Sequence, residues 1–161
     1  MTTIDVGGIR LIAIHLRRLM DANRDRMLEL DRAIGDGDLG LTMTRAFAAA
    51  EEASAMDEQV PGRLLMRMGM AMSKAAPSTM GTLMATGFMR GGKALGEASA
   101  IGTVECAVFL RAFVEGLMER GKTRPGHKTV VDSLDPAATA LEVAAANGDD
   151  LVTALSAAAA A

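Results

Sequence analysis

Aromatic side chains are scarce in this chain: tryptophan and tyrosine are absent, and only four phenylalanines occur among 161 residues. Half of the residues are nevertheless hydrophobic, so alanine, leucine and 13 methionines must fill the interior. These residues favour helices, and few segments have the enrichment in β-branched and aromatic residues that is typical of strands. The composition therefore predicts an all-α protein whose length suits one domain with a buried core.

Other absences exclude classes of function. Charges of both signs are mixed along the chain with a net charge of −3, and no basic stripe with interleaved aromatics is present, which argues against nucleic-acid binding. Cys106, the single cysteine, cannot form an intrachain disulfide, as suits a reducing cytosol. No signal-peptide pattern opens the chain, and no apolar stretch reaches the roughly 18 residues of a membrane span. We therefore expect a cytoplasmic protein without a membrane span.

Apolar residues at helical spacing predict a helix around residues 9–19, and Asn23 is suited to cap a second helix that stops at Gly35. Further helices are expected over residues 41–53, 63–75, 79–95 and 103–121, the last capped by Thr103. The Pro61-Gly62 pair marks a connection, and Pro77 interrupts the chain before residue 79.

Two more helices are expected at the C-terminal end, one opened by Thr129 and one capped by Asp149 after the Asn147-Gly148 break. Asp132 stands three residues after Thr129, which is a capping-box arrangement. No repeat or linker divides the chain, so residues 1–161 are expected to form one domain. The chain reaches Ala161 in mid-helix without a stop signal, which suggests that natural sequence continues beyond it.

The stretch LDRAIGDGDLGLTM, residues 30–43, crowds Asp31, Asp36 and Asp38 into eight positions. Asp31 falls in the last turn of a predicted helix, where the helix dipole disfavours a carboxylate. The glycines around the other two permit positive φ, so the loop can fold back and bring the three carboxylates together. Such oxygen ligands suit Mg²⁺ or Ca²⁺ better than zinc. The alternative is a solvated helix end; an EF-hand is disfavoured because no glutamate stands at its twelfth position.

Two further segments could bind phosphate. In AAPSTMGTLM, residues 75–84, Pro77-Ser78-Thr79 stops one helix and caps the next, so the N–H groups near Met80 and Gly81 are free to bind an anion. In GKTRPGHKTVVD, residues 121–132, a Gly/Pro turn leads to another helix start beside three basic residues. Taken alone, each segment is more typical of an ordinary helix cap than of a phosphate site. His127 is more typical of a surface turn than of a ligand.

The remaining candidates favour structure over chemistry. His15 lies in mid-helix, and no Ser–His–Asp or Cys–His arrangement is present. The methionine-rich stripe over residues 66–89 is more typical of core, although flexible thioethers could line an adenine pocket. The three loops together are more informative than any one of them, because each follows a helix and could lie at one end of an antiparallel bundle. Carboxylates for a divalent metal beside two phosphate-binding helix starts indicate a nucleotide site.

The motifs LDRAIGDGDLGLTM, STMGTL and RPGHKTVVDSLDP resemble, in order and spacing, the nucleotide-binding L subunit of dihydroxyacetone kinases. This family also forms the C-terminal domain of single-chain, ATP-dependent enzymes. The resemblance implies a barrel of about eight antiparallel helices, here C-terminally incomplete, with nucleotide at one rim. Asp31, Asp36 and Asp38 would bind two Mg²⁺ ions, and ADP or ATP would contact a set drawn from all three loops: Leu39, Gly40, Leu41, Thr42, Thr79, Met80, Gly81, Gly121, Thr129 and Val130.

The resemblance also implies partners. The family passes a phosphoryl group to dihydroxyacetone held by a histidine of a separate K subunit, and in the phosphotransferase-system branch an M subunit recharges the bound ADP. A homodimer is also possible. Because phosphoryl transfer depends on positioning and charge neutralisation, the site needs no protein nucleophile, and we expect little activity from this chain alone.

The chain departs from the family pattern at two places. Leu39 stands where a histidine is common, which would fit a branch acting on another ketose such as a tetrulose. The Gly-Arg-Ala and Asp-Pro-Gly elements that would cover the nucleotide are not present, so we expect weakened nucleotide affinity and an exposed apolar seam. The leading hypothesis is a kinase subunit; the alternatives are a nucleotide- or ligand-sensing regulator without turnover and a purely structural helical protein.

Overall fold

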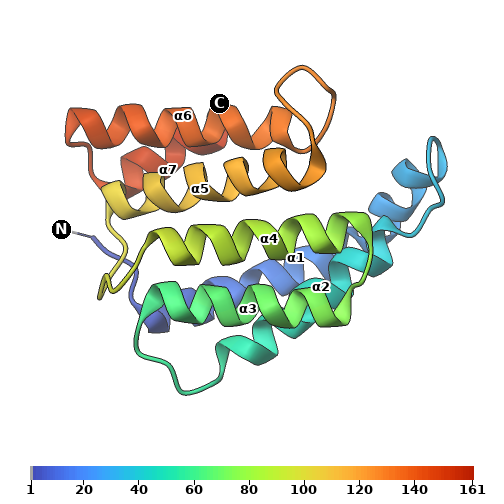
Figure 1. Cartoon of the computed structure of the whole chain (residues 1–161), viewed down its shortest axis with the longest axis horizontal. Helices are drawn as coiled ribbons and strands as arrows, with labels where there is room; N and C mark the ends of the chain where they lie inside the picture. The colour runs from blue at the N-terminus through green and yellow to red at the C-terminus, as the bar shows by residue number, and fades with distance from the viewer. Residues whose placement is uncertain (1) are drawn as a thin grey trace.

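The computed structural model describes residues 2–161, and within this range the chain forms seven helices and no strand. Each helix packs against the next along the chain, and neighbouring helices run in opposite directions (Figure 1). An isolated antiparallel bridge joins Ile4 to Ile101. The predicted all-α antiparallel bundle is confirmed. The helices are α1 (Val6–Arg32), α2 (Leu39–Ser54), α3 (Pro61–Ala75), α4 (Thr79–Ala94), α5 (Thr103–Gly121), α6 (Val131–Asn147) and α7 (Leu151–Ala160).

The first helix differs from the prediction. The expected break at Asn23 is wrong, because α1 runs without interruption to Arg32. The Asn23 side chain does not cap a new helix; its amide donates a hydrogen bond of 2.9 Å to the carbonyl of Leu19, one turn earlier. No glycine or proline lies between Ile9 and Arg32, so nothing in the backbone requires the helix to stop.

The other predicted helices are confirmed with small shifts at their ends. Pro61 and Gly62 do not form a connection but belong to the first turn of α3, where proline is well tolerated because its missing N–H has no helical partner. Gly102, not Thr103, caps α5, and Asp150, not Asp149, caps α7 by accepting from the N–H groups of Val152 and Thr153. Such one-residue errors arise because several adjacent residues can serve as caps.

The α6 start is only partly the predicted capping box. The helix begins at Val131, two residues after Thr129. The Asp132 carboxylate accepts the N–H of Thr129 at 2.7 Å, as a capping box requires, but the Thr129 hydroxyl accepts from Val131 at 3.2 Å and not from Asp132. The carboxylate also accepts from the Gly126 N–H. These N–H groups, that of Thr129 above all, lower the pKa of Asp132.

Close helix contacts explain much of the glycine and methionine content of α3 and α4. A Cβ on Gly62 would lie 2.5 Å from the carbonyl oxygen of Gly92, and one on Gly92 would lie 2.6 Å from that of Gly62, so both positions need glycine. Met68, Met72 and Met84 are buried in the core, as the sequence predicted for the methionine stripe, whereas Met70 is 47% exposed. None of the helices in the described part of the chain is long and apolar enough to cross a membrane.

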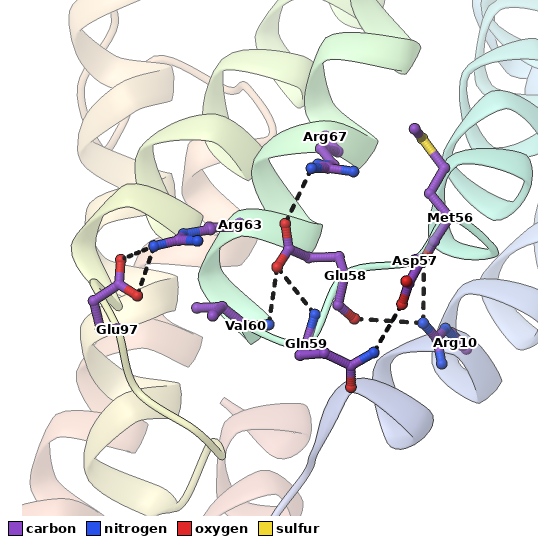
Figure 2. A network of polar contacts seen from close by, with 9 residues as sticks. All are labelled: Arg10, Met56, Asp57, Glu58, Gln59, Val60, Arg63, Arg67 and Glu97. Atoms are coloured by element: carbon purple, nitrogen blue, oxygen red, sulfur yellow. Dashed lines mark hydrogen bonds and ion pairs between the residues drawn. The ribbon is translucent and has the colours of Figure 1, made fainter.

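A polar network joins α1 to the connection between α2 and α3 (Figure 2). The Glu58 side chain is buried and accepts the N–H groups of Gln59 at 3.0 Å and Val60 at 3.1 Å. Arg67 lies 3.2 Å from the same carboxylate, while Arg10 donates to the carbonyls of Met56 and Glu58 in the connection. Hydrogen bonding from Val60, with Gln59 and Arg67 adding to it, lowers the pKa of Glu58. This network lies at the opposite end of the bundle from residues 30–38 (Figure 1).

Candidate functional site

The three aspartates of the acidic stretch meet at the turn between α1 and α2. Asp31 lies in the last turn of α1, Asp38 precedes the first residue of α2, and Asp36 lies on the loop between them. Gly37, with φ of +74°, provides the left-handed residue that folds the loop back. One carboxylate oxygen of each aspartate lies within 4.8 Å of those of the other two. A cluster of carboxylate oxygens at this spacing fits a hard divalent cation such as Mg²⁺.

The Asp31 side chain also stabilises the turn between α1 and α2. Its Oδ2 accepts the backbone N–H of Asp38 at 2.9 Å and that of Leu39 at 3.1 Å. The carboxylate that the end of α1 disfavours is therefore stabilised by the N-terminus of α2, whose dipole has the opposite sign at this point. Asp38 itself makes no side-chain hydrogen bond to the helix it precedes. The three aspartates thus differ in what they contribute to the fold.

Packing restricts the start of α2. A Cβ on Gly40 would lie 2.3 Å from the carbonyl oxygen of Arg24, so glycine is needed where α2 crosses α1. The Leu39 N–H is held by Asp31, and the Thr42 N–H donates to the Asp38 carbonyl. The N–H groups of Gly40 and Leu41 have no acceptor in the described chain. Of the four residues predicted here as nucleotide ligands, these two retain free backbone donors.

The acidic loop and the start of α4 share a pocket of about 280 Å³, which we call the aspartate pocket. The Ser78 hydroxyl caps α4 by accepting the Gly81 N–H at 3.1 Å. The backbone N–H groups of Thr79 and Met80 have no acceptor in the described chain. Gly81 is buried, and a Cβ there would lie 2.1 Å from the Ala76 carbonyl oxygen, so this glycine has a packing role. The aspartate pocket is lined by Asp31, Asp36, Asp38, Leu39, Ser78, Thr79 and Met80.

A larger pocket of about 770 Å³, the central pocket, adjoins the aspartate pocket and shares Ser78 and Thr79 with it. It reaches Gly121 at the end of α5, so the structure brings a residue of the third predicted segment to the same end of the bundle (Figure 1). The lining residues are Ser73, Pro77, Ser78, Thr79, Thr82, Leu83, Arg120 and Gly121.

Thr129 and Val130 line neither pocket. Thr129 is exposed, with its hydroxyl 3.4 Å from that of Thr123, and Val130 packs against the core. His127 lies exposed on the turn beside Arg124, as expected of a surface residue. Of the residues predicted to contact the nucleotide, Leu39, Thr79, Met80 and Gly121 therefore line the two pockets, and the others do not.

Sequence reasoning missed several residues that line the central pocket, among them Ser73, Thr82 and Arg120. Two of them had a signal. Thr82 follows Thr79 by one helical turn and so faces the same side of α4, and Arg120 immediately precedes Gly121. Ser73 had no such signal, because its place beside α4 depends on how α3 and α4 cross.

Comparison with known proteins gives the family context. The family model of the DAK2 domain matches residues 33–161, a range that includes Asp36 and Asp38 but begins after Asp31. The chain is 32% identical over 122 residues to the ADP-binding subunit DhaL of PEP-dependent dihydroxyacetone kinase 1 from Listeria innocua, covering 74% of this chain and 60% of the relative. It is 33% identical over 113 residues to the corresponding Escherichia coli subunit, covering 70% of this chain and 54% of the relative.

A longer relative is an L-erythrulose kinase from Pectobacterium atrosepticum, 34% identical over 128 residues, which cover 78% of this chain and 22% of that enzyme. The matched region thus spans little more than half of the separate subunits and about a fifth of the longer kinase.

Proposed function

The chain belongs to the DAK2 domain family, and on that basis we propose that it is the nucleotide-binding subunit of a dihydroxyacetone-type ketose kinase. In this role it binds ADP or ATP with Mg²⁺ in the cytoplasm and presents a phosphoryl group to a ketose held by a separate K subunit. Relatives named as ADP-binding subunits of dihydroxyacetone kinases support the assignment.

One observation carries the proposal: the three aspartates face the start of α4 across a single pocket. A polyphosphate in this pocket would meet a metal site on one side and free helix N–H groups on the other. Both attract anions, and both keep them in a defined orientation. A solvated helix end would explain the aspartates but not why they lie against unpaired N–H donors.

The residues divide into roles within this proposal. Asp31, Asp36 and Asp38 hold two Mg²⁺ ions, which neutralise charge on the phosphates when bound. Backbone N–H groups orient the phosphate oxygens, with Gly40 and Leu41 on α2 and Thr79 and Met80 on α4 as the free donors. Gly121 lines the adjoining central pocket, where the nucleoside lies. The proposed nucleotide contacts also include Leu39, whose apolar side chain forms part of the wall of the aspartate pocket. The remaining proposed contacts are Thr42, Gly81, Thr129 and Val130.

The acceptor and the phosphoryl donor depend on partners. No side chain in the aspartate pocket is suited to hold a ketose covalently, so a K subunit supplies that function, and an M subunit recharges ADP if the donor is the phosphotransferase system. Relatives named as L- and D-erythrulose kinases make a tetrulose an alternative to dihydroxyacetone. Leu39 is an apolar residue of the pocket wall and fits such a branch.

Calorimetry tests the binding step. We expect ADP to bind the chain in the presence of Mg²⁺ and to bind far more weakly when Mg²⁺ is removed with EDTA. A coupled assay with a K subunit, supplied with dihydroxyacetone or erythrulose, then measures phosphoryl transfer. Binding of ADP that is indifferent to Mg²⁺ would contradict the role of the aspartates. Mg²⁺-dependent binding without turnover on either ketose would instead favour a regulator.

A further inference from the structure

Arg120 stands at the junction of two pockets. It lines the central pocket and also a neighbouring pocket of about 550 Å³ between α4 and α5, which shares Ser73 and Thr82 with the first. Arg120 lies at the end of α5, one residue before Gly121. Figure 1 shows this end of α5 at the same end of the bundle as the turn between α1 and α2. Arg120 does not line the aspartate pocket itself.

The guanidinium of Arg120 is available to a ligand. None of the ion pairs in the described part of the chain includes this residue. Its neighbour Glu119, the one carboxylate that lines the α4–α5 pocket, is paired with Arg90. Arg120 is therefore an exposed cation, and the carboxylate that shares the α4–α5 pocket with it is already engaged.

Neither the aspartate pocket nor the central pocket is lined by an aromatic ring that could stack on a nucleotide base. The chain has no tryptophan or tyrosine, and its four phenylalanines pack against one another in the core. The central pocket has apolar lining from Pro77 and Leu83, but its one planar side chain is that of Arg120. A guanidinium is planar and weakly hydrated, and it stacks well on aromatic faces.

We propose that Arg120 stacks on the base of the bound nucleotide and so takes the place of an aromatic side chain. The inference rests on the proposed function, which puts the phosphates in the aspartate pocket. From there the nucleoside extends past Ser78 and Thr79 into the central pocket, where Arg120 lies. A role as a phosphate ligand is less well supported, because the phosphates lie in the pocket that Arg120 does not reach.

The test compares two ligands and three variants by calorimetry in Mg²⁺. ADP has phosphates and a base, whereas pyrophosphate has phosphates alone. Arg120→Ala removes the guanidinium, and Arg120→Lys keeps the positive charge but replaces the planar guanidinium with an ammonium group that cannot stack. Arg18→Ala is the matched control, since Arg18 is also exposed and unpaired in the described chain but lies on α1 and lines none of the pockets discussed. Melting temperatures check that each variant is folded.

We expect both Arg120 variants to weaken ADP binding, Arg120→Ala by about tenfold, and to leave pyrophosphate binding unchanged. The control should bind both ligands as the original chain does. Unchanged ADP affinity in Arg120→Ala would overturn the inference. So would an equal loss for ADP and pyrophosphate, which marks a phosphate contact, or full affinity in Arg120→Lys, which marks a role for charge alone. If the original chain binds neither ligand, the proposed function fails and the inference with it.

Discussion

At the scale of single residues, the three aspartates share a cluster but not a structural role. Asp31 accepts two backbone N–H groups at the start of α2, whereas the side chains of Asp36 and Asp38 accept no hydrogen bond within the described part of the chain. All three carboxylates repel one another when no cation lies between them. Only for Asp31 does hydrogen bonding offset that repulsion, so substitutions within the cluster should have different effects on stability.

We expect Asp36→Asn and Asp38→Asn to abolish Mg²⁺-dependent ADP binding while the metal-free melting temperature stays the same or rises. Asp31→Ala should also abolish binding, but it should lower the metal-free melting temperature by about 2–4 °C, which corresponds to the loss of about 1 kcal/mol of capping energy in a chain of this size. Thermal unfolding in EDTA measures the temperatures. A large drop for Asp36→Asn or Asp38→Asn would show that these residues are structural and would count against a metal site.

At the scale of elements, Glu58 holds the connection between α2 and α3 in place (Figure 2). The ionised carboxylate accepts two N–H groups in front of α3 and pairs with Arg67 in the second turn of that helix. An anion at a helix N-terminus is favourable, so the charged form is the one the fold stabilises. The lowered pKa of Glu58 expresses the same preference.

This preference predicts how stability depends on pH. A carboxylate whose pKa is lower in the folded chain than its unfolded value of about 4.3 stabilises the fold at higher pH, and the contribution is lost as pH falls through the folded pKa. We therefore expect Glu58→Gln to melt below the original chain at pH 7, with the difference shrinking below about pH 4.3. Thermal unfolding from pH 7 to pH 3 checks this. Glu29→Gln, at an exposed position of α1, is the control and should show no such difference. If the difference in melting temperature between Glu58→Gln and the original chain stays constant with pH, a contribution from the Glu58 charge is ruled out.

At the scale of the whole molecule, the few aromatic residues join separate helices. Phe88 on α4 makes edge-to-face contacts with Phe47 on α2 and with Phe109 and Phe113 on α5, at centroid distances of 5.5–6.2 Å. Phe88 is itself buried. Since α2 and α5 are distant in the sequence, this cluster is one of the contacts that make the bundle a cooperative unit.

We expect Phe88→Ala to lower the free energy of unfolding by about 3–5 kcal/mol, because it removes a buried ring and leaves a cavity at the centre of the cluster. Urea unfolding followed by circular dichroism measures the change. Met70→Ala is a suitable comparison, since Met70 is 47% exposed and should change stability by less than about 0.5 kcal/mol. A loss below about 1 kcal/mol at Phe88 would mean that the cluster does not hold the helices together.

Much of the fold and part of the site could be predicted from local sequence signals. Apolar spacing located the helices, and Pro77 and the Asn147-Gly148 pair marked breaks that the structure has. The stretch LDRAIGDGDLGLTM identified the three aspartates that the structure brings together. Asn23 misled the prediction because a cap and a helix-interior residue look alike until the hydrogen-bond partner is known, here the Leu19 carbonyl.

The sequence by itself determined that this protein is helical, where most of its helices lie and which residues form its acidic loop, because these features depend on neighbours within a few positions along the chain. Only the tertiary structure decided that the acidic loop faces the start of α4, that Gly40 must be glycine beside the Arg24 carbonyl, and that Arg120 borders the central pocket. Those features depend on how helices cross. Crossing is set by the packing of side chains far apart in the sequence, and no local pattern contains that information.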